Sequence, residues 1–554
     1  MSDLPPYPPL DPTTYDLIIV GTGVPSSILA AAASSSGSSS VLHLDPNPFY
    51  GSHFASLSLP DLTSFLNSNS LPPPPSNTHD FLSVDLVNRS LYSSVEISTF
   101  EPETLEQHSR TFNIDLCGPR AVFCADESIN LMLKSGSNNY VEFKSVDASF
   151  VGDSSGDLRN VPDSRGAIFK DKGLTLLEKN QLMKFFKLVQ THLASSSTEH
   201  DQTAVKVMSE EDMESPFVEF LSKMRLPQKI KSIILYGIAM LDHDQDNIEE
   251  TCEHVLKTKE GIDRLALYIT SISRFSNAHG ALMYPMYGQG ELPQAFCRRA
   301  AVKGCIYVLR MPVTSLLLDK ETGGYKGVRL ASGQEIFSQK LVLDPSITVG
   351  VESLPSLTDQ QKETLRVLVP KAVSSKEKIA RGICIIRGSV KADISNALVV
   401  YPPKSLFPEQ LTAVRVLQLG SGLAVCPPDI HALYLSTVCG DDNQGKTAVL
   451  SAISTLIRPQ VPEDLQTDSI AENDTAVTKP VVIWRALYVQ ELVKGEFGGE
   501  ISSTSSPDGN LNYNEIVESA MKLYEQLMGN KELFKEETEN TAEEDDGDGV
   551  EIED

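Results

Sequence analysis

The sequence lacks the features that assign a chain to most common functional classes. Its eight cysteines include no C-x-x-C pair and no cysteine–histidine cluster with zinc spacing. No apolar run approaches the roughly 20 residues that span a bilayer, and the proline-rich segment 1–10 does not have the pattern of a signal peptide. These absences predict a cytoplasmic protein with reduced thiols and no metal site.

The motifs of common enzymes are missing too. The chain has no G-x-S-x-G elbow, no P-loop, no H-E-x-x-H and no kinase signature, and its ten histidines are scattered. No catalytic residue is therefore predicted. The net charge of −27 argues against nucleic acid as a partner, because nonspecific binding requires a basic surface. Eleven acids and no bases lie between Glu536 and Asp554, an end that we expect to be disordered.

The clearest pattern that is present lies between Tyr15 and Gly51. Leu17–Val20 is a short apolar run rich in branched residues, which is typical of a strand buried on both faces. Ser26–Ala33 is small and apolar, which favours a closely packed helix, and Val41–Leu44 is predicted to be a second buried strand. This order of elements is that of a dinucleotide-binding βαβ unit.

The glycines of this unit match the dinucleotide fingerprint only in part. The fingerprint is G-x-G-x-x-G, and this chain has Gly21, Gly23 and then Ser26. Pro25 removes one N–H that could hold a phosphate at the start of the helix. Asp45 lies close to the place of the ribose-binding acid. Two interpretations stay open: a working flavin or nicotinamide site, and a βαβ unit that has lost its nucleotide.

Between about Leu174 and Phe275 the pattern becomes helical. Thr175 and Glu178 form a T-x-x-E capping box. Apolar residues then recur at helical spacing, which predicts an inserted helical domain whose faces form its core. A few of these residues can line a pocket for an apolar ligand. The first apolar face comprises Leu182, Phe185, Phe186, Val189 and Leu193.

A further helix is expected after Gly290. Glu291, Gln294, Arg298 and Ala301 fall on one of its faces. This face is either a docking surface or an ordinary solvated face with an N-terminal acid favoured by the helix dipole. The residues expected to anchor the helix on its other faces are Leu292, Ala295, Phe296 and Val302.

The remaining pattern predicts a mixed sheet and a closing helix. The predicted hairpins and strands are 140–146, 313–343, 379–386, 413–417 and 481–489, and the helix is 513–527. His43 is expected to be a core residue with satisfied nitrogens, whereas His53 could face a site. The residues thus support two classes: a flavin-dependent oxidoreductase with a helical substrate domain, and a nonenzymatic binding protein on the same scaffold.

Several blocks resemble the Rab GDP-dissociation inhibitor and Rab escort protein superfamily, in the order of that family. They are YDLIIVGTGVPSSILAAAAS, VLHLDPNPFYGSHFASLSL, FNIDLCGPRAVF, NNYVEFKSVDASF and YPMYGQGELPQAFCRRAAVKGCIYVLR. Three further stretches look like the escort branch: VPDSRGAIFKDKGLTLLEKNQLMKFF, AVRVLQLGSGLAVCP and IWRALYVQ. The larger insertion after Gly51 points to the same branch.

The resemblance implies an α/β fold: a flavoprotein-like domain, Rossmann-type βαβ plus mixed sheet, with an inserted all-helical domain. Family members do not use flavin, so no cofactor is expected. The motif of Gly21, Gly23, Ser26 and Asp45 would then be a vestigial FAD site. The implied division is 1–160 (first part, with a loop insertion at 67–77), 161–275 (helical domain), 276–530 (second part, with a linker at 461–477) and 531–554 (acidic tail).

The resemblance also implies partners. An escort protein presents GDP-bound Rab GTPases to the α/β dimer of Rab geranylgeranyltransferase. It then shields the geranylgeranyl lipid and delivers the product to a membrane, which it contacts transiently. The family's Rab-binding platform, carried over to this chain, falls on Tyr50, Glu291 and Arg298. The family's transferase-contacting aromatic falls near Tyr268, and the helical domain should supply the lipid slot.

One departure concerns the loop LDHDQDNIEE at residues 241–250, which is acidic and longer than its counterpart in the inhibitor branch. That counterpart carries an arginine for Rab contact, so this loop is expected to contact Rab differently or to serve the escort role only. Two alternatives to an escort protein remain: a Rab GDP-dissociation inhibitor and an FAD-dependent, amine oxidase-like enzyme.

Overall fold

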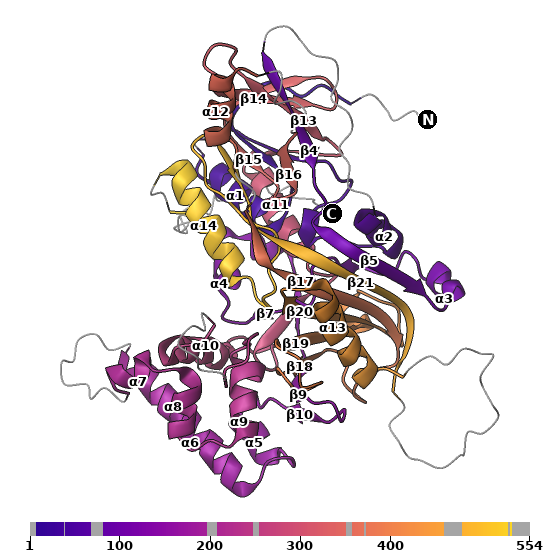
Figure 1. Cartoon of the computed structure of the whole chain (residues 1–554), viewed down its shortest axis with the longest axis vertical. Coiled ribbons are helices and arrows are strands. Elements are labelled where there is room, and N and C mark those ends of the chain that lie inside the picture. Colours follow the sequence, from indigo (N-terminus) through magenta and orange to yellow (C-terminus); the bar gives the residue numbers. More distant parts are fainter. Residues whose placement is uncertain are drawn as a thin grey trace, which may run out of the picture.

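The structure is a computed structural model that describes residues 7–37, 39–67, 81–196, 208–246, 254–350, 357–370, 373–458, 479–529 and 532–534. The predicted loop insertion from residue 68 on, the linker 461–477, nearly all of the acidic tail and the last four residues of the 241–250 loop lie outside these ranges. The predicted α/β class with a βαβ unit, a mixed sheet and a run of helices is confirmed (Figure 1).

The βαβ unit belongs to a nine-stranded sheet, in the order β12-β2-β1-β15-β14-β13-β4-β16, with β22 paired to β15. Strands β12, β2, β1 and β15 run parallel, and the strands from β15 to β16 are antiparallel. The bounds are β1 Thr14–Val20, β2 Val41–Asp45, β4 Leu82–Asn88, β12 Ile306–Leu309, β13 Val313–Leu318, β14 Tyr325–Leu330, β15 Glu335–Leu343, β16 Ile347–Val349 and β22 Ile501–Ser503.

Helix α1 (Val24–Ser35) covers the parallel part of this sheet. Four consecutive alanines at 30–33 are buried in it, and their small side chains permit close packing against α11 (Glu291–Val302) and α14 (Asn514–Met528). Of the residues predicted to anchor α11, Leu292, Ala295 and Phe296 are buried. The prediction for Val302 is wrong, since this side chain is 65% exposed. It lies in the last turn, beyond the contact with α1.

The second sheet has eight strands in the order β10-β9-β18-β19-β20-β17-β21-β5. Helix α13 (Asp442–Leu456) packs on one face. The bounds are β5 Tyr92–Thr99, β9 Ala148–Gly152, β10 Leu158–Asn160, β17 Val373–Arg387, β18 Ala397–Tyr401, β19 Val414–Gly420, β20 Ile430–Cys439 and β21 Val481–Lys494. The predicted strands 379–386, 413–417 and 481–489 are confirmed within β17, β19 and β21.

The sequence analysis missed regular structure between Gly51 and Phe112. Strands β4 and β5 come from this segment, and each joins a different large sheet. Both are edge or near-edge strands with half-exposed side chains, so their apolar alternation is weak. The predicted strand at 140–146 is shorter than expected, because η2 (Ser137–Tyr140) is a 3₁₀ turn. The small sheets contain β3 Ser56–Leu57 with β6 Ile114–Asp115, and β7 Val122–Phe123, β11 Leu282–Pro285 and β8 Phe143–Ser145.

A group of helices lies at one end of the molecule, at the lower left of Figure 1. Its bounds are α5 Arg165–Lys170, α6 Leu176–Ser196, α7 Glu210–Glu214, α8 Phe217–Lys223, α9 Gln228–Ser232, the π-helix η3 Ile233–Ile238 and α10 Thr258–Ser271. The predicted capping box is present, since Thr175 N donates to Glu178 and Glu178 N donates to Thr175. Leu182, Phe185 and Val189 are buried as predicted.

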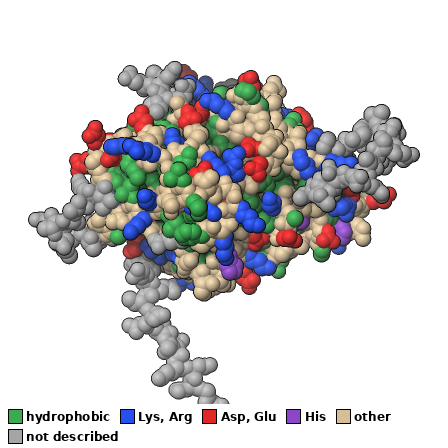
Figure 2. Space-filling view, turned by 90° about the horizontal axis from the view of Figure 1, so that it is seen from below, with side chains coloured by type: hydrophobic (Ala, Val, Ile, Leu, Met, Phe, Trp, Pro, Cys, Tyr) green, Lys and Arg blue, Asp and Glu red, His purple; other side chains and the backbone are tan. Residues whose placement is uncertain are grey.

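The helical group shares one apolar core with the second sheet. Gly237 in η3 packs directly on this sheet, because a Cβ there would lie 2.7 Å from Val161 Cγ2 and 3.0 Å from Val151 Cγ2. Viewed from this end, the surface shows hydrophobic patches among lysines and arginines (Figure 2). None of the helices in the described part of the chain is both long and apolar enough to cross a membrane.

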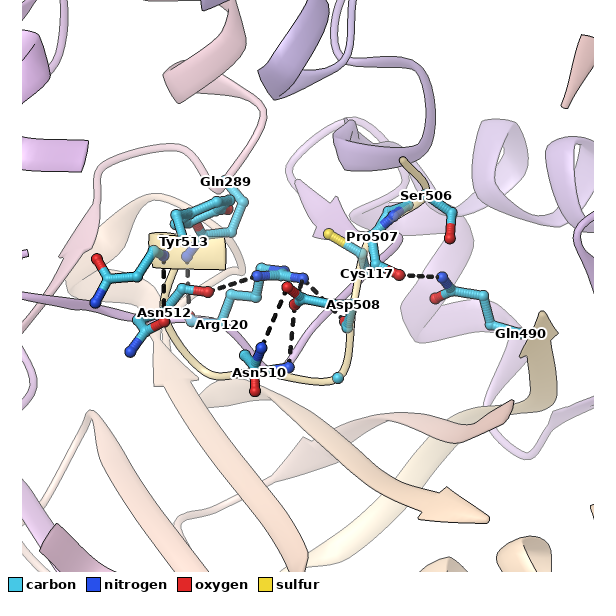
Figure 3. Close-up of polar contacts among 12 residues, drawn as sticks. Cys117, Arg120, Gln289, Gln490, Ser506, Pro507, Asp508, Asn510, Asn512 and Tyr513 are labelled. Carbon is cyan, nitrogen blue, oxygen red and sulfur yellow. Dashed lines mark hydrogen bonds and ion pairs between the residues drawn. The ribbon is translucent and has the colours of Figure 1, made fainter. Parts of the chain in front are cut away.

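Residues 504–513, which we call the strap, run from β22 to α14 and are held by three buried arginines. Figure 3 shows the contacts of one of them, Arg120. Arg120 donates to the carbonyls of Asp508 (2.9 Å) and Asn512 (2.7 Å) and to the Asp508 carboxylate (2.5 Å). Arg381 reaches the same Asp508 carbonyl, and Arg415 reaches that of Gly509. All three arginines are buried, so the strap supplies the acceptors that make their burial tolerable. The other helices are α2 Leu59–Asn67, α3 Pro102–Gln107, α4 Glu127–Ser135 and α12 Asp359–Leu368, with 3₁₀ turns η1 Ser52–Phe54 and η5 Ser421–Leu423.

Candidate functional site

The turn after β1 carries the incomplete fingerprint. Gly21 has φ +91°, and a Cβ there would lie 2.5 Å from Asp344 Oδ2, so only glycine is accommodated. Gly23 precedes α1, and Ser26 is buried in its first turn. The end of β15 therefore lies directly against the turn, through the carboxylate of Asp344.

Asp45 has no free acceptor positions for a ribose. Its Oδ2 accepts from Thr22 N (2.8 Å), Thr22 Oγ1 (2.6 Å) and Ser52 Oγ (2.9 Å), and its Oδ1 accepts from Asn47 N and Nδ2. Burial raises the pKa of Asp45, and these hydrogen bonds oppose the rise. The acid that would bind a dinucleotide is thus fully used by the chain itself. We call these contacts the Asp45 network.

The space beside the Asp45 network does not fit a dinucleotide. The cavity there has a volume of about 20 Å³ and is lined in part by Ser52, His53, Phe65 and Asp344. His53, which could face a site according to the sequence, is buried. Its Nε2 lies 3.2 Å from Asp344 Oδ1, and its Nδ1 lies 2.9 Å from the Tyr92 hydroxyl. This volume accommodates about one water molecule.

The Asp45 network instead holds the segment that carries Tyr50. Gly51 N donates to Thr22 Oγ1 (2.8 Å), and Ser52 Oγ bonds the Asp45 carboxylate. Gly51 has φ +102°, and a Cβ there would lie 2.8 Å from Ala55 Cα. The residues of the fingerprint therefore position a surface segment.

The structure brings Tyr50 and α11 together. Tyr50 and Glu291 line one open cavity of about 360 Å³, with Tyr287 and Gln294. Arg298 is exposed one turn further along α11. Burial raises the pKa of both the Tyr50 hydroxyl and the Glu291 carboxyl, and the positive charge of Arg298 lowers both. The three predicted platform residues thus lie within electrostatic reach of one another.

Sequence reasoning missed Tyr287 as part of this surface. Its side chain is 55% exposed, and its backbone has φ +68°, which is rare for an aromatic residue. Phe49 and Asn113 also line the cavity. Gly288, directly after Tyr287, was the available signal, since glycine marks turns and turns lie at the surface.

Asp115 holds the turn before α11 from beneath. Its carboxylate accepts from Ser56 Oγ (2.7 Å), Gln289 N (2.9 Å) and the Tyr284 hydroxyl (2.5 Å). Burial raises the pKa of Asp115, and these bonds oppose that rise. The strap adds a further support, since the Tyr513 hydroxyl donates to Gln289 Oε1 (2.6 Å; Figure 3). The turn that precedes α11, and with it the first residue of the helix, is therefore held in one position.

Tyr268 is almost entirely buried and lines part of an open cavity of about 750 Å³. The side chain is 3% exposed, its hydroxyl donates to the carbonyl of Pro162, and its ring packs on Phe123. The apolar face of α10 is turned into the core, and the assignment of Tyr268 as a transferase contact stays a prediction. On the nearby surface of α5 and α6, the exposed apolar side chains are Phe169, Leu176 and Leu177.

The described part of the acidic loop is used internally. Asp242 Oδ1 lies 2.8 Å from Arg415 Nη1, and Asp244 forms an ion pair with Lys404. Asp246 accepts from Gln228. Residues 241–246 thus connect the helical group to the second sheet.

Protonation of His43 is expected to destabilise the fold in mild acid. His43 is buried in β2, as predicted, and its ring nitrogens contact Gly21 O (2.6 Å) and the Tyr307 hydroxyl (2.7 Å). Burial lowers the pKa of His43 to about 4, against a smaller opposing effect of the Gly21 hydrogen bond. The pKa of a histidine in the unfolded chain is higher, about 6.5. The contribution of neutral His43 to the free energy of unfolding is therefore complete above about pH 6.5 and is lost as the pH falls toward 4.

At pH 5 the loss should be about 2 kcal/mol, since one pKa unit corresponds to about 1.4 kcal/mol. Denaturant unfolding at pH 7 and pH 5 measures it, with His43→Asn as the comparison. The variant should show a smaller difference between the two pH values. Equal differences in the two proteins would contradict the assignment to His43.

Comparison of the sequence with known protein families identifies the family of this chain. The model of a family described as "GDI: GDP dissociation inhibitor" matches residues 11–99 and 83–405. Since these matches cover more than half of the 554 residues, the chain belongs to the GDP dissociation inhibitor family.

Individual relatives are more specific. The chain is 80% identical to "Rab escort protein 1" of Arabidopsis thaliana over the full length of both chains. It is 24% identical to "Rab proteins geranylgeranyltransferase component A 2" of Homo sapiens, over 94% of this chain and 92% of that one. Among solved structures, a Rab GDI from Plasmodium falciparum has a TM-score of 0.66 at 18% identity and covers 94% of this chain and 99% of its own, which shows a shared fold.

Proposed function

We propose that the chain is a Rab escort protein, the accessory component of Rab geranylgeranyltransferase. It binds GDP-bound Rab, presents it for C-terminal geranylgeranylation and delivers the lipidated product to membranes. The observation that carries this proposal is the 80% identity to a Rab escort protein over the full length of both chains. The matches to component A of the transferase support the same role.

The Rab-binding platform in this proposal comprises Tyr50, Glu291 and Arg298. A tyrosine and an exposed arginine are residue types that often dominate the energy of an interface. The Asp45 network and Asp115 fix the two segments that carry them, so little conformational entropy is lost on binding. The hydrogen bonds beneath the platform thus favour a preformed docking surface.

An escort protein of this kind needs no cofactor and no catalytic residue of its own. The occupied carboxylate of Asp45 and the cavity of about 20 Å³ beside it support a vestigial FAD site. The chemistry would then belong to the transferase α/β dimer, which supplies the prenyl transfer. Escort function requires binding, orientation and shielding from water.

Shielding the geranylgeranyl lipid is assigned to the helical domain, within the proposed division at about residues 161–275. Each CH₂-sized group of the lipid costs about 0.8 kcal/mol to expose to water. The exposed Phe169, Leu176 and Leu177 provide apolar surface on this domain for the transferase. A cytoplasmic location with transient membrane contact follows from this role.

Reconstitution tests the proposed function. An unprenylated Rab, the transferase dimer and labelled geranylgeranyl diphosphate are mixed with and without this chain. We expect label on the Rab only when the chain is present. A failure of transfer combined with extraction of lipidated Rab from membranes would instead establish a Rab GDP-dissociation inhibitor. A bound yellow chromophore would support the FAD-dependent, amine oxidase-like alternative.

A further inference from the structure

Two histidines and a glutamate converge where the helical group meets the second sheet. His243 follows η3, His254 precedes α10, and Glu377 lies near the start of β17. The Glu377 Oε1 atom lies 3.5 Å from His243 Nε2 and 3.9 Å from His254 Nε2. One potential ligand atom from each residue lies within 4.8 Å of the other two.

A buried amide holds both histidines in place. Gln245 is 1% exposed, and its Nε2 donates to the carbonyls of His243 (3.1 Å) and His254 (3.0 Å). Its Oε1 accepts from Leu256 N, which completes the hydrogen bonding of the amide. One side chain thus fixes the backbone of two positions that are eleven residues apart in the sequence.

The histidines are also fixed to the second sheet. His243 forms a β-bridge with Thr412, and Ala413 N donates to the carbonyl of Asp242 (2.7 Å). The Asp242 carboxylate is paired with Arg415. The backbone of His243 and His254 is therefore held in place, although the side chains of the two histidines and Glu377 are partly exposed.

The residue types suit a transition-metal ion. Two imidazoles and one carboxylate are a common ligand set for zinc with an open fourth position. The two rings are stacked, with centroids 3.9 Å apart.

We propose that His243, His254 and Glu377 bind a divalent transition-metal ion, with zinc as the best-suited species. The ion would link the connection before α10 to the first residues of β17. A cavity of about 140 Å³, lined in part by His243, Glu377 and Thr412, adjoins the group and leaves room for a metal-bound water. This site is independent of the Rab-binding platform.

The geometry requires a modest closure on binding. Tetrahedral zinc with bonds of about 2.0–2.2 Å places its ligand atoms about 3.4 Å apart. The Glu377–His243 distance already meets this value, so the exposed ring of His254 is the group that must turn. Its side chain is 51% exposed, which leaves it free space to do so.

The test is zinc binding by the full-length chain, freed of affinity tag and metal. Titration of Zn²⁺ against a chromophoric chelator should show one tight site per chain, and Co²⁺ should give the intense visible bands of tetrahedral coordination. Zinc should raise Tm by about 3 °C or more, because it binds only the folded state. His254→Gln and Glu377→Gln should each weaken zinc binding at least tenfold.

His279→Gln is the matched control, because His279 is an exposed histidine outside the group. Its zinc affinity should equal that of the wild type. Unchanged affinity in both His254→Gln and Glu377→Gln, or no binding by the wild type, would overturn the proposal. Circular dichroism of the metal-free variants separates loss of the site from loss of the fold.

Discussion

Replacing Arg120 with methionine should lower the free energy of unfolding by about 3–5 kcal/mol, the usual result of removing one partner of a buried ion pair. Methionine fills much of the same volume but donates no hydrogen bond. The carbonyl of Asn512 would lose its Arg120 donor, and the carboxylate of Asp508 would lose its charged partner and keep only the donors of Asn510. The Asp508 carbonyl would keep the hydrogen bond from Arg381, so the strap would stay attached there and be weakened at the contacts that Arg120 makes.

Denaturant unfolding monitored by circular dichroism measures this loss. Arg366→Met is the matched control, because Arg366 is exposed on α12 and its ion pair with Glu363 is a surface pair. It should change the free energy by less than about 0.5 kcal/mol. A loss below about 1 kcal/mol for Arg120→Met would contradict the role assigned to Arg120.

Replacing Arg298 with alanine should weaken the binding of GDP-loaded Rab by about 2 kcal/mol or more, roughly 30-fold in Kd. Arg298 is exposed on α11, so the change should leave the fold intact. The arginine offers five donors in a planar fork, which alanine cannot replace. Titration calorimetry with a GDP-loaded Rab measures the affinity.

The control for Arg298 is Lys303→Ala, which removes an exposed positive charge just beyond the same helix. If Rab is held only by general electrostatic attraction, the two variants should weaken binding equally. If the platform is correct, the Lys303 variant should bind nearly as well as the wild type. Unchanged affinity of the Arg298 variant would show that the platform lies elsewhere.

The elements with strong periodicity could be predicted from the sequence. Leu17–Val20 and Val41–Leu44 are buried strands, and the helix after Gly290 begins where its glycine and acid indicated. These features depend on neighbours within a few residues. Strand β5 could not be predicted, since its stability comes from pairing with β21, almost 400 residues later.

The candidate site was predictable only in its outline. The incomplete fingerprint left open whether the nucleotide site works or is lost. The five donors to Asp45 come from Thr22, Asn47 and Ser52, whose roles depend on the folded backbone. The burial of Tyr268 could not be predicted from the sequence either. Helical spacing identifies which residues share a face, but does not identify which face a core will cover.

The support beneath α11 has a consequence for protein synthesis. Gln289 receives one hydrogen bond from Tyr513, and the backbone of its turn is held by Asp115. These partners lie 174 and 224 positions away along the chain, on opposite sides of the turn. A ribosome must therefore release almost the whole polypeptide before this surface is complete. Messages that end before codon 513 would yield chains that lack one of the supports beneath α11.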